Sequence, residues 1–230
     1  MYVARQHAIE AEKALEMAQK QASGELITHG ANGLNATRLP FVVVQRDGCT
    51  ILQMHMNRVN PQWHDAAPAE ALFVVTGPDA HVYGHYLPVE APDARMPTVP
   101  TWDYVTVHFR GTLTLHDDDD WKADHVVRLQ QAIEPEWTIE RNSDWAKIRH
   151  AFLAMVGLEL EVASVEGKAK LHQSSAAYEI ADIADHLEAG GATEVADLMR
   201  EISIPWAKER EAAVGHARER ATLPITRADF

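Results

Sequence analysis

The sequence predicts an α+β domain built on an antiparallel β-barrel. Segments rich in β-branched and aromatic residues follow one another with tight-turn residues between them, which is typical of β-hairpins. Helical segments interrupt these hairpins instead of alternating with single strands, which argues against a parallel sheet. The chain has 230 residues, enough for one large domain with its own core.

The first half of the chain is expected to begin with a helix over residues 8–22, where apolar residues recur at helical spacing. Four strands should follow, over residues 25–29, 36–45, 49–56 and 71–76. The pair Asp47-Gly48 is a hairpin signal, because both residue types accept a positive φ. The pair Gly77-Pro78 is expected to end the strand before it.

The second half should open with a proline-rich loop over residues 85–100, which is long enough to be a binding loop. A long strand is expected over residues 101–115. Helices are expected over residues 117–133, 142–155, 174–189 and 193–202, and strands over residues 156–165 and 168–172. Asn142 or Ser143 should cap the second of these helices. Glu166-Gly167 should form a turn, and a charged helical tail should follow Ile204.

Composition and charge narrow the function classes. The net charge is −13, so duplex DNA should repel the surface, and direct DNA binding is not expected. A single cysteine, Cys49, excludes an intrachain disulfide and fits a reducing cytoplasm, where this residue should act as a small apolar side chain in a strand. No run of about 18 apolar residues is present, so no membrane span is expected.

Four segments combine polar side chains with a predicted strand end or turn, namely residues 36–41, 55–63, 99–108 and 165–173. Arg58 can grip a phosphate or carboxylate with paired donors. Thr37 and Asn60 can donate hydrogen bonds without adding charge. Trp63 and Trp102 offer flat surfaces to a planar ligand. Lys168 and Lys170 share one side of a strand and could add positive charge. In an acidic chain, this collection suggests an anionic small-molecule ligand. The alternative is that Arg58 pairs with a nearby carboxylate and that both tryptophans belong to the core.

These same segments resemble the PaiB-like family of FMN-binding negative transcriptional regulators. The family pattern His-Met-x-Arg-x-Asn-Pro-Gln-Trp appears here as residues 55–63, and Val-Pro-Thr-Trp-x-Tyr as residues 99–104. A third run, ending in Glu-Gly-Lys-x-Lys-Leu-x-Gln, appears as residues 166–173. The resemblance extends over roughly residues 1–203 and does not cover the tail.

The resemblance implies a flavin-reductase-like split β-barrel with peripheral helices, formed by residues 1–203. The charged helical C-terminal tail over residues 204–230 lies outside the resemblance and is expected from its own composition. The resemblance also implies a homodimer with FMN bound at the subunit interface. The cofactor contacts that it suggests are Thr37, Arg58, Trp102, Lys168 and Lys170. The chemistry of the motif at residues 55–63 adds His55, Asn60 and Trp63 as candidates.

The same superfamily includes haem-binding members, and piperazate synthase, a haem enzyme that joins two nitrogens, looks PaiB-like. In this chain the segment His81–Tyr86 replaces a Ser-Pro-Ser-Trp-Tyr-like run of the family, and the sequence holds 13 histidines. Histidine is the usual axial ligand of haem. If haem b is the cofactor, His55 is the first candidate for its axial ligand and His64 the second.

Three functions therefore stay open. The first is an FMN-binding homodimer with a regulatory or sensor role. The second is a haem-dependent enzyme related to piperazate synthase, acting on a small hydroxylated amine or amino acid. The third is a cofactor-free interaction dimer in which the tail, over residues 206–220, binds a partner.

Overall fold

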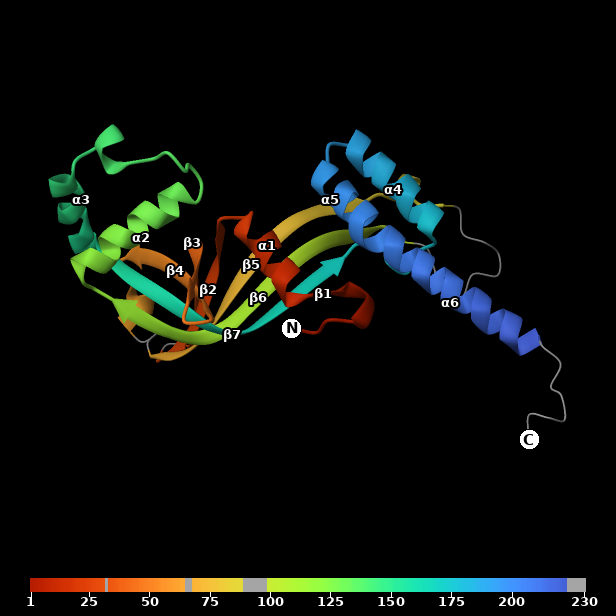
Figure 1. Cartoon of the computed structure of the whole chain (residues 1–230), viewed down its shortest axis with the longest axis horizontal. Coiled ribbons are helices and arrows are strands. Elements are labelled where there is room, and N and C mark those ends of the chain that lie inside the picture. Colours follow the sequence, from red (N-terminus) through yellow and green to blue (C-terminus); the bar gives the residue numbers. More distant parts are fainter. Residues whose placement is uncertain (32, 65–67, 89–98, 223–230) are drawn as a thin grey trace. The chain divides into compact units, whose positions relative to one another are not determined.

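The computed structural model describes residues 1–31, 33–64, 68–88 and 99–222 (Figure 1). The chain divides into two compact units. The first unit comprises Met1, Ile9–Gly77 and Thr106–Lys168. The second comprises Tyr2–Ala8, Pro78–Val105 and Ala169–Phe230. Three long strands each contain a boundary between the units, so neither unit is a single continuous stretch of sequence.

The strands form one antiparallel sheet that closes on itself, which confirms the predicted split barrel. The strands are β1 (Ala8–Ile9), β2 (Ser23–Gly30), β3 (Gly33–Arg46), β4 (Cys49–Asn57), β5 (Ala69–Val82), β6 (Thr101–His116) and β7 (Met155–Lys170). Their order is β1-β7-β4-β3-β2-β5-β6, and a further pairing of β6 with β7 closes the ring. Closure leaves no long unpaired edge among these strands.

The barrel interior is filled by alternate residues of the strands. On β4, Leu52 and Met54 are fully buried, and on β7, Leu158 and Leu160 are fully buried. Phe41 and Phe73 meet edge to face, with ring centroids 5.1 Å apart. Each such side chain contributes about 1.5–3 kcal/mol by leaving water. Because side chains alternate along a strand, the intervening residues of β4 and β7 point to the outer face of the barrel.

The helices divide between the units. The first unit holds α1 (Ala11–Gln19), α2 (Asp119–Gln131) and α3 (Trp145–Ala151), and the second holds α4 (Ala177–Ala189), α5 (Thr193–Leu198) and α6 (Ile204–Thr222). A π-helical turn, Met199–Ser203, joins α5 to α6. Short 3-10 turns occupy Arg5–His7, Pro61–His64, Gly84–Tyr86, Ile139–Arg141 and Phe152–Ala154. Among the residues described, no helix has both the length and the apolar character needed to cross a bilayer.

Two predicted strand ends are wrong. The strand β5 continues through Gly77-Pro78 to Val82. Proline has no N–H to donate, and it is tolerated here because Pro78 lies beyond Leu72–Val74, the part of β5 that pairs with β2. The predicted turn at Glu166-Gly167 is part of the continuous strand β7. A Cβ on Gly167 would lie 2.6 Å from the Cβ of Ala14 in α1. Glycine is therefore required here by close packing and not by a turn.

Other local predictions differ in smaller ways. The first helix is shorter than expected, and its first residues are taken by β1. Asp144, and not Asn142 or Ser143, caps α3, since its carboxylate accepts the backbone N–H of Lys147 at 2.9 Å. Cys49 is exposed at the start of β4 and is not a packed apolar side chain. The hairpin at Asp47-Gly48 is confirmed, with φ of 54° and 80°.

Residues 89–98 of the predicted binding loop lie outside the described residues, as do residues 223–230 of the tail. The described part of the tail is the helix α6, as expected. The predicted domain boundary after residue 203 stays a prediction. Ala207 of α6 is fully buried, and Arg210 donates to the carbonyl oxygens of Gln173 and Ser175, each at 2.6 Å. The start of the tail is therefore packed within the second unit.

Candidate functional site

Three of the polar residues around the predicted motif form one network in the first unit. Asn60 Nδ2 donates to Thr37 Oγ1 at 3.0 Å, and Thr37 Oγ1 donates to Gln62 Oε1 at 2.5 Å. The buried Gln62 also donates to Thr28 Oγ1 at 3.0 Å. These bonds fix the 3-10 turn that follows β4 against strands β2 and β3. Sequence reasoning placed Thr37 and Asn60 at a common site, and the structure does bring them together.

Arg58 joins the same turn to the loop before β7. Its Nε donates to the carbonyl oxygen of Leu153 at 2.9 Å, and its Nη2 donates to that of Met155 at 3.0 Å and to the carboxylate of Asp117. Hydrogen bonds from Arg58 and Lys122 lower the pKa of Asp117 to about 2. The alternative reading of Arg58, pairing with a nearby carboxylate, is thus present in the structure. Among the described residues, Nη1 makes no hydrogen bond, so two guanidinium donors stay available to a ligand.

Trp63 completes this group. Its indole N–H donates to the carbonyl oxygen of Arg58 at 2.8 Å, and the Arg58 guanidinium lies 5.8 Å from the ring centroid. The ring of His64 stacks on Trp63 at a centroid distance of 3.9 Å. Trp63 is partly buried and packs against the barrel core. We call Thr37, Arg58, Asn60, Trp63 and His64 the motif cluster.

His55 belongs to a different group, on the outer face of the barrel. Its Nδ1 lies 2.9 Å from Nε2 of His125, which projects from α2 and is fully buried. His125 stacks on Trp121 one helical turn earlier, and Trp121 stacks on His116 at the end of β6 with a centroid distance of 4.6 Å. Four aromatic rings thus form a continuous row under α2.

A buried carboxylate holds this row in place. Glu159 of β7 accepts hydrogen bonds from Arg46 Nη2 at 2.7 Å, Gln53 Nε2 at 2.7 Å and Trp121 Nε1 at 2.9 Å. Nε2 of His116 lies 3.3 Å from the same carboxylate. Gln53 and Glu159 are cross-strand partners on the outer face of β4 and β7. We call this group, together with His55 and His125, the outer-face cluster.

The environment of the outer-face cluster sets its protonation. Burial raises the pKa of Glu159, but the hydrogen bonds from Arg46, Trp121 and Gln53 outweigh it and bring the pKa to about 2. Burial, with a smaller contribution from the charge of His55, lowers the pKa of His125 to about 3. Burial also lowers the pKa of His55. Near neutral pH the cluster therefore holds a carboxylate and a neutral histidine pair.

A surface cavity of about 400 Å³ opens beside the outer-face cluster. Its lining residues come from strands β3, β6 and β7 and are all polar or charged: Arg46, Thr112, Thr114, His116, Glu159 and Glu161. None of them was among the predicted contacts. The alternation of β7 could have indicated that Glu159 faces outward. It could not show that Trp121 of α2 covers Glu159, because these two residues are 38 positions apart in the sequence.

The remaining predicted contacts lie elsewhere. Lys168 is half-buried in β7, in the first unit. Trp102 and Lys170 lie in the second unit, where Lys170 Nζ donates to the carbonyl oxygen of Trp102 at 2.5 Å and to Thr101 Oγ1 at 2.7 Å. The indole N–H of Trp102 donates to Asp79 at 2.9 Å, and 52% of this residue is exposed. Trp102 is therefore not a core residue, and the predicted contacts include residues of both units.

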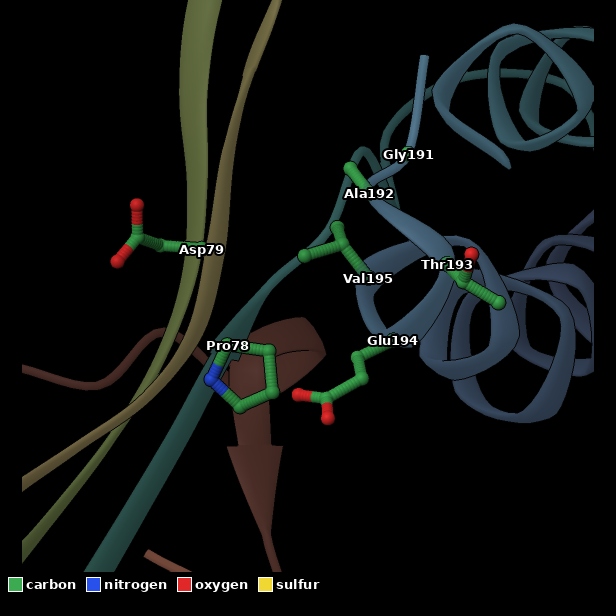
Figure 2. Close-up of a pocket in the computed structure, with 7 residues that line it drawn as sticks. All are labelled: Pro78, Asp79, Gly191, Ala192, Thr193, Glu194 and Val195. Atoms are coloured by element: carbon green, nitrogen blue, oxygen red, sulfur yellow. The ribbon is translucent and has the colours of Figure 1, made fainter. Parts of the chain in front are cut away.

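The second unit also holds a cavity of about 310 Å³, drawn in Figure 2. Its lining residues are Pro78, Asp79, Gly191, Ala192, Thr193, Glu194 and Val195. Figure 2 shows the Asp79 carboxylate pointing away from Glu194. The charged residues of this lining, Asp79 and Glu194, are both acidic, so the lining does not favour an anionic cofactor.

Comparison with known proteins agrees with the geometry of the barrel. Residues 1–164 match the model of a family described as "Putative FMN-binding domain". A curated relative, protease synthase and sporulation protein PAI 2 of Bacillus subtilis (strain 168), is 24% identical over 204 residues, covering 83% of this chain and 92% of the relative.

Two solved structures share the fold at low sequence identity. The flavocytochrome Anf3 from Azotobacter vinelandii is 17% identical with a TM-score of 0.54, covering 73% of this chain and 72% of that one. The FAD and heme binding protein from Mycobacterium smegmatis is 19% identical with a TM-score of 0.52, covering 71% and 73%. At these identities the likeness shows the split-barrel fold alone. Since the matched residues 1–164 make up more than half of the chain and include the predicted motif at residues 55–63, the chain belongs to the PaiB-like family of FMN-binding-domain proteins.

Proposed function

We propose that this chain is an FMN-binding homodimer with a regulatory or sensor role. The observation that carries the proposal is the motif cluster, in which the turn after β4 pairs Asn60 with Thr37 of β3 and Trp63 with Arg58. All four residues were expected to contact a cofactor. The family to which the chain belongs is described by FMN binding, and the curated relative in Bacillus subtilis is named for protease synthesis and sporulation.

The donor set of the motif cluster is compatible with FMN. Arg58 is held in place by three hydrogen bonds and keeps its Nη1 donors for a phosphate oxygen. Trp63 gives a flat ring beside this cation. Bound FMN would supply redox chemistry, and the protein side chains would bind and orient it. Thr37 and Asn60 hold the turn in shape, and a homodimer would place a second subunit's surface over it.

The proposed role acts through protein or ligand contacts and not through DNA. The net charge of −13 disfavours a phosphate backbone as partner. A flavin whose binding or redox state changes the surface of the dimer would give the chain a way to sense metabolism.

The test is a titration of FMN into the full chain, followed by flavin absorbance and fluorescence quenching. Arg58→Gln should weaken FMN binding about 10- to 100-fold, as expected for loss of a charge-assisted hydrogen bond. Arg38→Gln is the matched control, since Arg38 is exposed and pairs with Glu25. Circular dichroism should show both variants folded. Equal affinity of the wild type and Arg58→Gln would contradict the proposal, as would a monomer in sedimentation experiments with FMN present.

Haem b is the second candidate cofactor, and the His55–His125 hydrogen bond favours it. When His55 donates through Nδ1, its Nε2 carries the lone pair that an axial ligand needs. We expect haemin to give a Soret band with the wild type and with His64→Ala, and to lose it with His55→Ala. Loss only in His64→Ala would move the ligand to His64, and no Soret change in any protein would remove this candidate.

A further inference from the structure

Asp103 and His172 form a buried acid–base pair in the second unit. Asp103 lies on β6 and is fully buried, while His172 follows the end of β7. The Asp103 Oδ2 atom lies 2.5 Å from Nδ1 of His172. Its Oδ1 atom lies 3.3 Å from Nζ of Lys170. Each oxygen of the buried carboxylate therefore has its own partner.

This geometry fixes where the proton of the imidazole lies. Lys170 balances the charge of Asp103, and an ionised carboxylate only accepts hydrogen bonds. Nδ1 of His172 must then carry the proton that it shares with Asp103, and the lone pair of the neutral ring lies on Nε2. Among the described residues, Nε2 has no hydrogen-bond partner. It is not among the fully buried side-chain atoms that lack a partner, so it keeps some exposure to solvent. Nε2 is thus the ring atom that a ligand can reach.

The backbone conformation at His172 gives a second reason to look for a function of its side chain. Its φ is 58°, in the left-handed region that glycine and asparagine adopt more easily. The turn is held by Ser175 N–H, which donates to the His172 carbonyl oxygen at 2.9 Å, and by Gln173, whose amide bonds Ala169 and Leu171. A histidine kept at such a position is consistent with a functional side chain.

Asp103 and His172 lie at positions that the family pattern given above leaves open. Asp103 occupies the open position of Val-Pro-Thr-Trp-x-Tyr, and His172 occupies the second open position of Gly-Lys-x-Lys-Leu-x-Gln. Two positions that the pattern leaves free are thus filled by residues that form a complementary pair in space.

We infer that Asp103 and His172 form an acid–base dyad whose Nε2 atom takes a proton from a protonated amine or an acidic hydroxyl group of a small-molecule ligand. In this step the O–H or N–H bond of the ligand breaks, and its electron pair stays on the ligand. The proton binds Nε2, and the Asp103 carboxylate balances the imidazolium charge. Asp103 orients the ring, and Lys170 places a positive charge 3.3 Å from Asp103 Oδ1. Arg210 of α6 donates to the carbonyl oxygens of Gln173 and Ser175, which follow His172 in the chain. The inference does not depend on flavin binding.

The reactivity of Nε2 can be measured with diethyl pyrocarbonate, which attaches a carbethoxy group to an unprotonated imidazole nitrogen. Peptide mapping by mass spectrometry would follow His172, with the exposed His186 as internal reference in the same digest. Asp103→Asn should slow the modification of His172 about tenfold or more, because the amide can donate to Nδ1 and leave the proton on Nε2. Asp79→Asn, which removes a carboxylate that bonds Trp102 in the same unit, should leave the rate unchanged. Modification of His186 but not of His172 in the wild type, or an equal rate in Asp103→Asn, would overturn the inference.

A second measurement needs no variant. In the wild type, nitrogen-detected NMR of labelled histidine should show the His172 proton on Nδ1, with the downfield shift of a strong hydrogen bond to a carboxylate. A proton found on Nε2 at neutral pH would sink the dyad, whether or not Asp103→Asn folds.

Discussion

At the scale of single residues, Gly157 leaves the space that Trp121 of the outer-face cluster occupies. A Cβ built on Gly157 would lie 2.1 Å from Cζ3 of Trp121, so the indole would have to move. That movement would break its bond to Glu159 and its stacking on His116 and His125. We expect Gly157→Ala to lower the free energy of unfolding by about 1–3 kcal/mol, as overpacking does.

Urea unfolding followed by tryptophan fluorescence would measure this effect. Gly84→Ala is a suitable control, since among the described residues a Cβ there would meet only Pro100, at 3.5 Å. Unchanged stability in Gly157→Ala would show that α2 can shift at no cost.

His125 should make stability depend on pH. Its pKa is about 3 in the folded chain, against 6.5 for an ordinary histidine, because burial disfavours the charged ring. Between these two pH values the unfolded chain binds a proton that the folded chain does not, so the free energy of unfolding falls as pH falls through this window. We expect His125→Gln, which cannot titrate, to show a shallower decline from pH 6.5 to pH 3. Chemical denaturation at several pH values would measure it, and parallel curves would contradict the assignment.

At the scale of elements, α2 depends on its N-cap. Asp118 accepts the backbone N–H of Trp121 at 2.7 Å, and this bond satisfies one of the free donors at the helix start. Asp118→Ala should lower the free energy of unfolding by about 0.5–2 kcal/mol. Asp120→Ala is the matched control, since the Asp120 side chain is almost fully exposed and should change stability by less than about 0.5 kcal/mol. Equal effects of the two substitutions in thermal unfolding would remove the special role of the cap.

The elements also show what sequence can and cannot predict. Local signals worked where the physics is local, as at the Asp47-Gly48 hairpin and the Gly190-Gly191 break between helices. They failed at Gly167, because the demand for a small residue comes from Ala14, more than 150 positions away. A glycine needed for close packing and a glycine needed for a turn look the same in one sequence.

At the scale of the whole molecule, α6 is expected to be part of the second unit's fold. It packs on α4 and the π-helical turn, buries Ala207, and donates from Arg210 to the chain after β7. Deletion of residues 204–230 should therefore lower the melting temperature of the chain. Differential scanning calorimetry of the full and shortened chains would measure the change in melting temperature. A shortened chain that melts like the full one would instead favour a tail free to bind a partner.

The same scale explains why the sequence indicated one of the two polar clusters of the first unit and missed the other. The sequence motif at residues 55–63 is compact in the chain, so Arg58, Asn60 and Trp63 had to lie close together. The row from His55 to His116 draws on β4, β6 and α2, and no spacing in the sequence reports that contact. The fold class could be predicted because hairpins form between segments that are close in the sequence. The pairing of β6 with β7, which closes the barrel, joins distant segments and leaves no local signal.

The exposed thiol of Cys49 has a practical consequence for all of these tests. It is the only cysteine of the chain and stands at a hairpin beside Arg46, which reaches Glu159. Two chains could be crosslinked through it by air oxidation, so a dimer seen without reductant would say nothing about a native interface. Under reducing conditions the same sulfur accepts a maleimide dye at a single known position. Such a reporter would register ligand-induced changes near the outer-face cluster without any engineered cysteine.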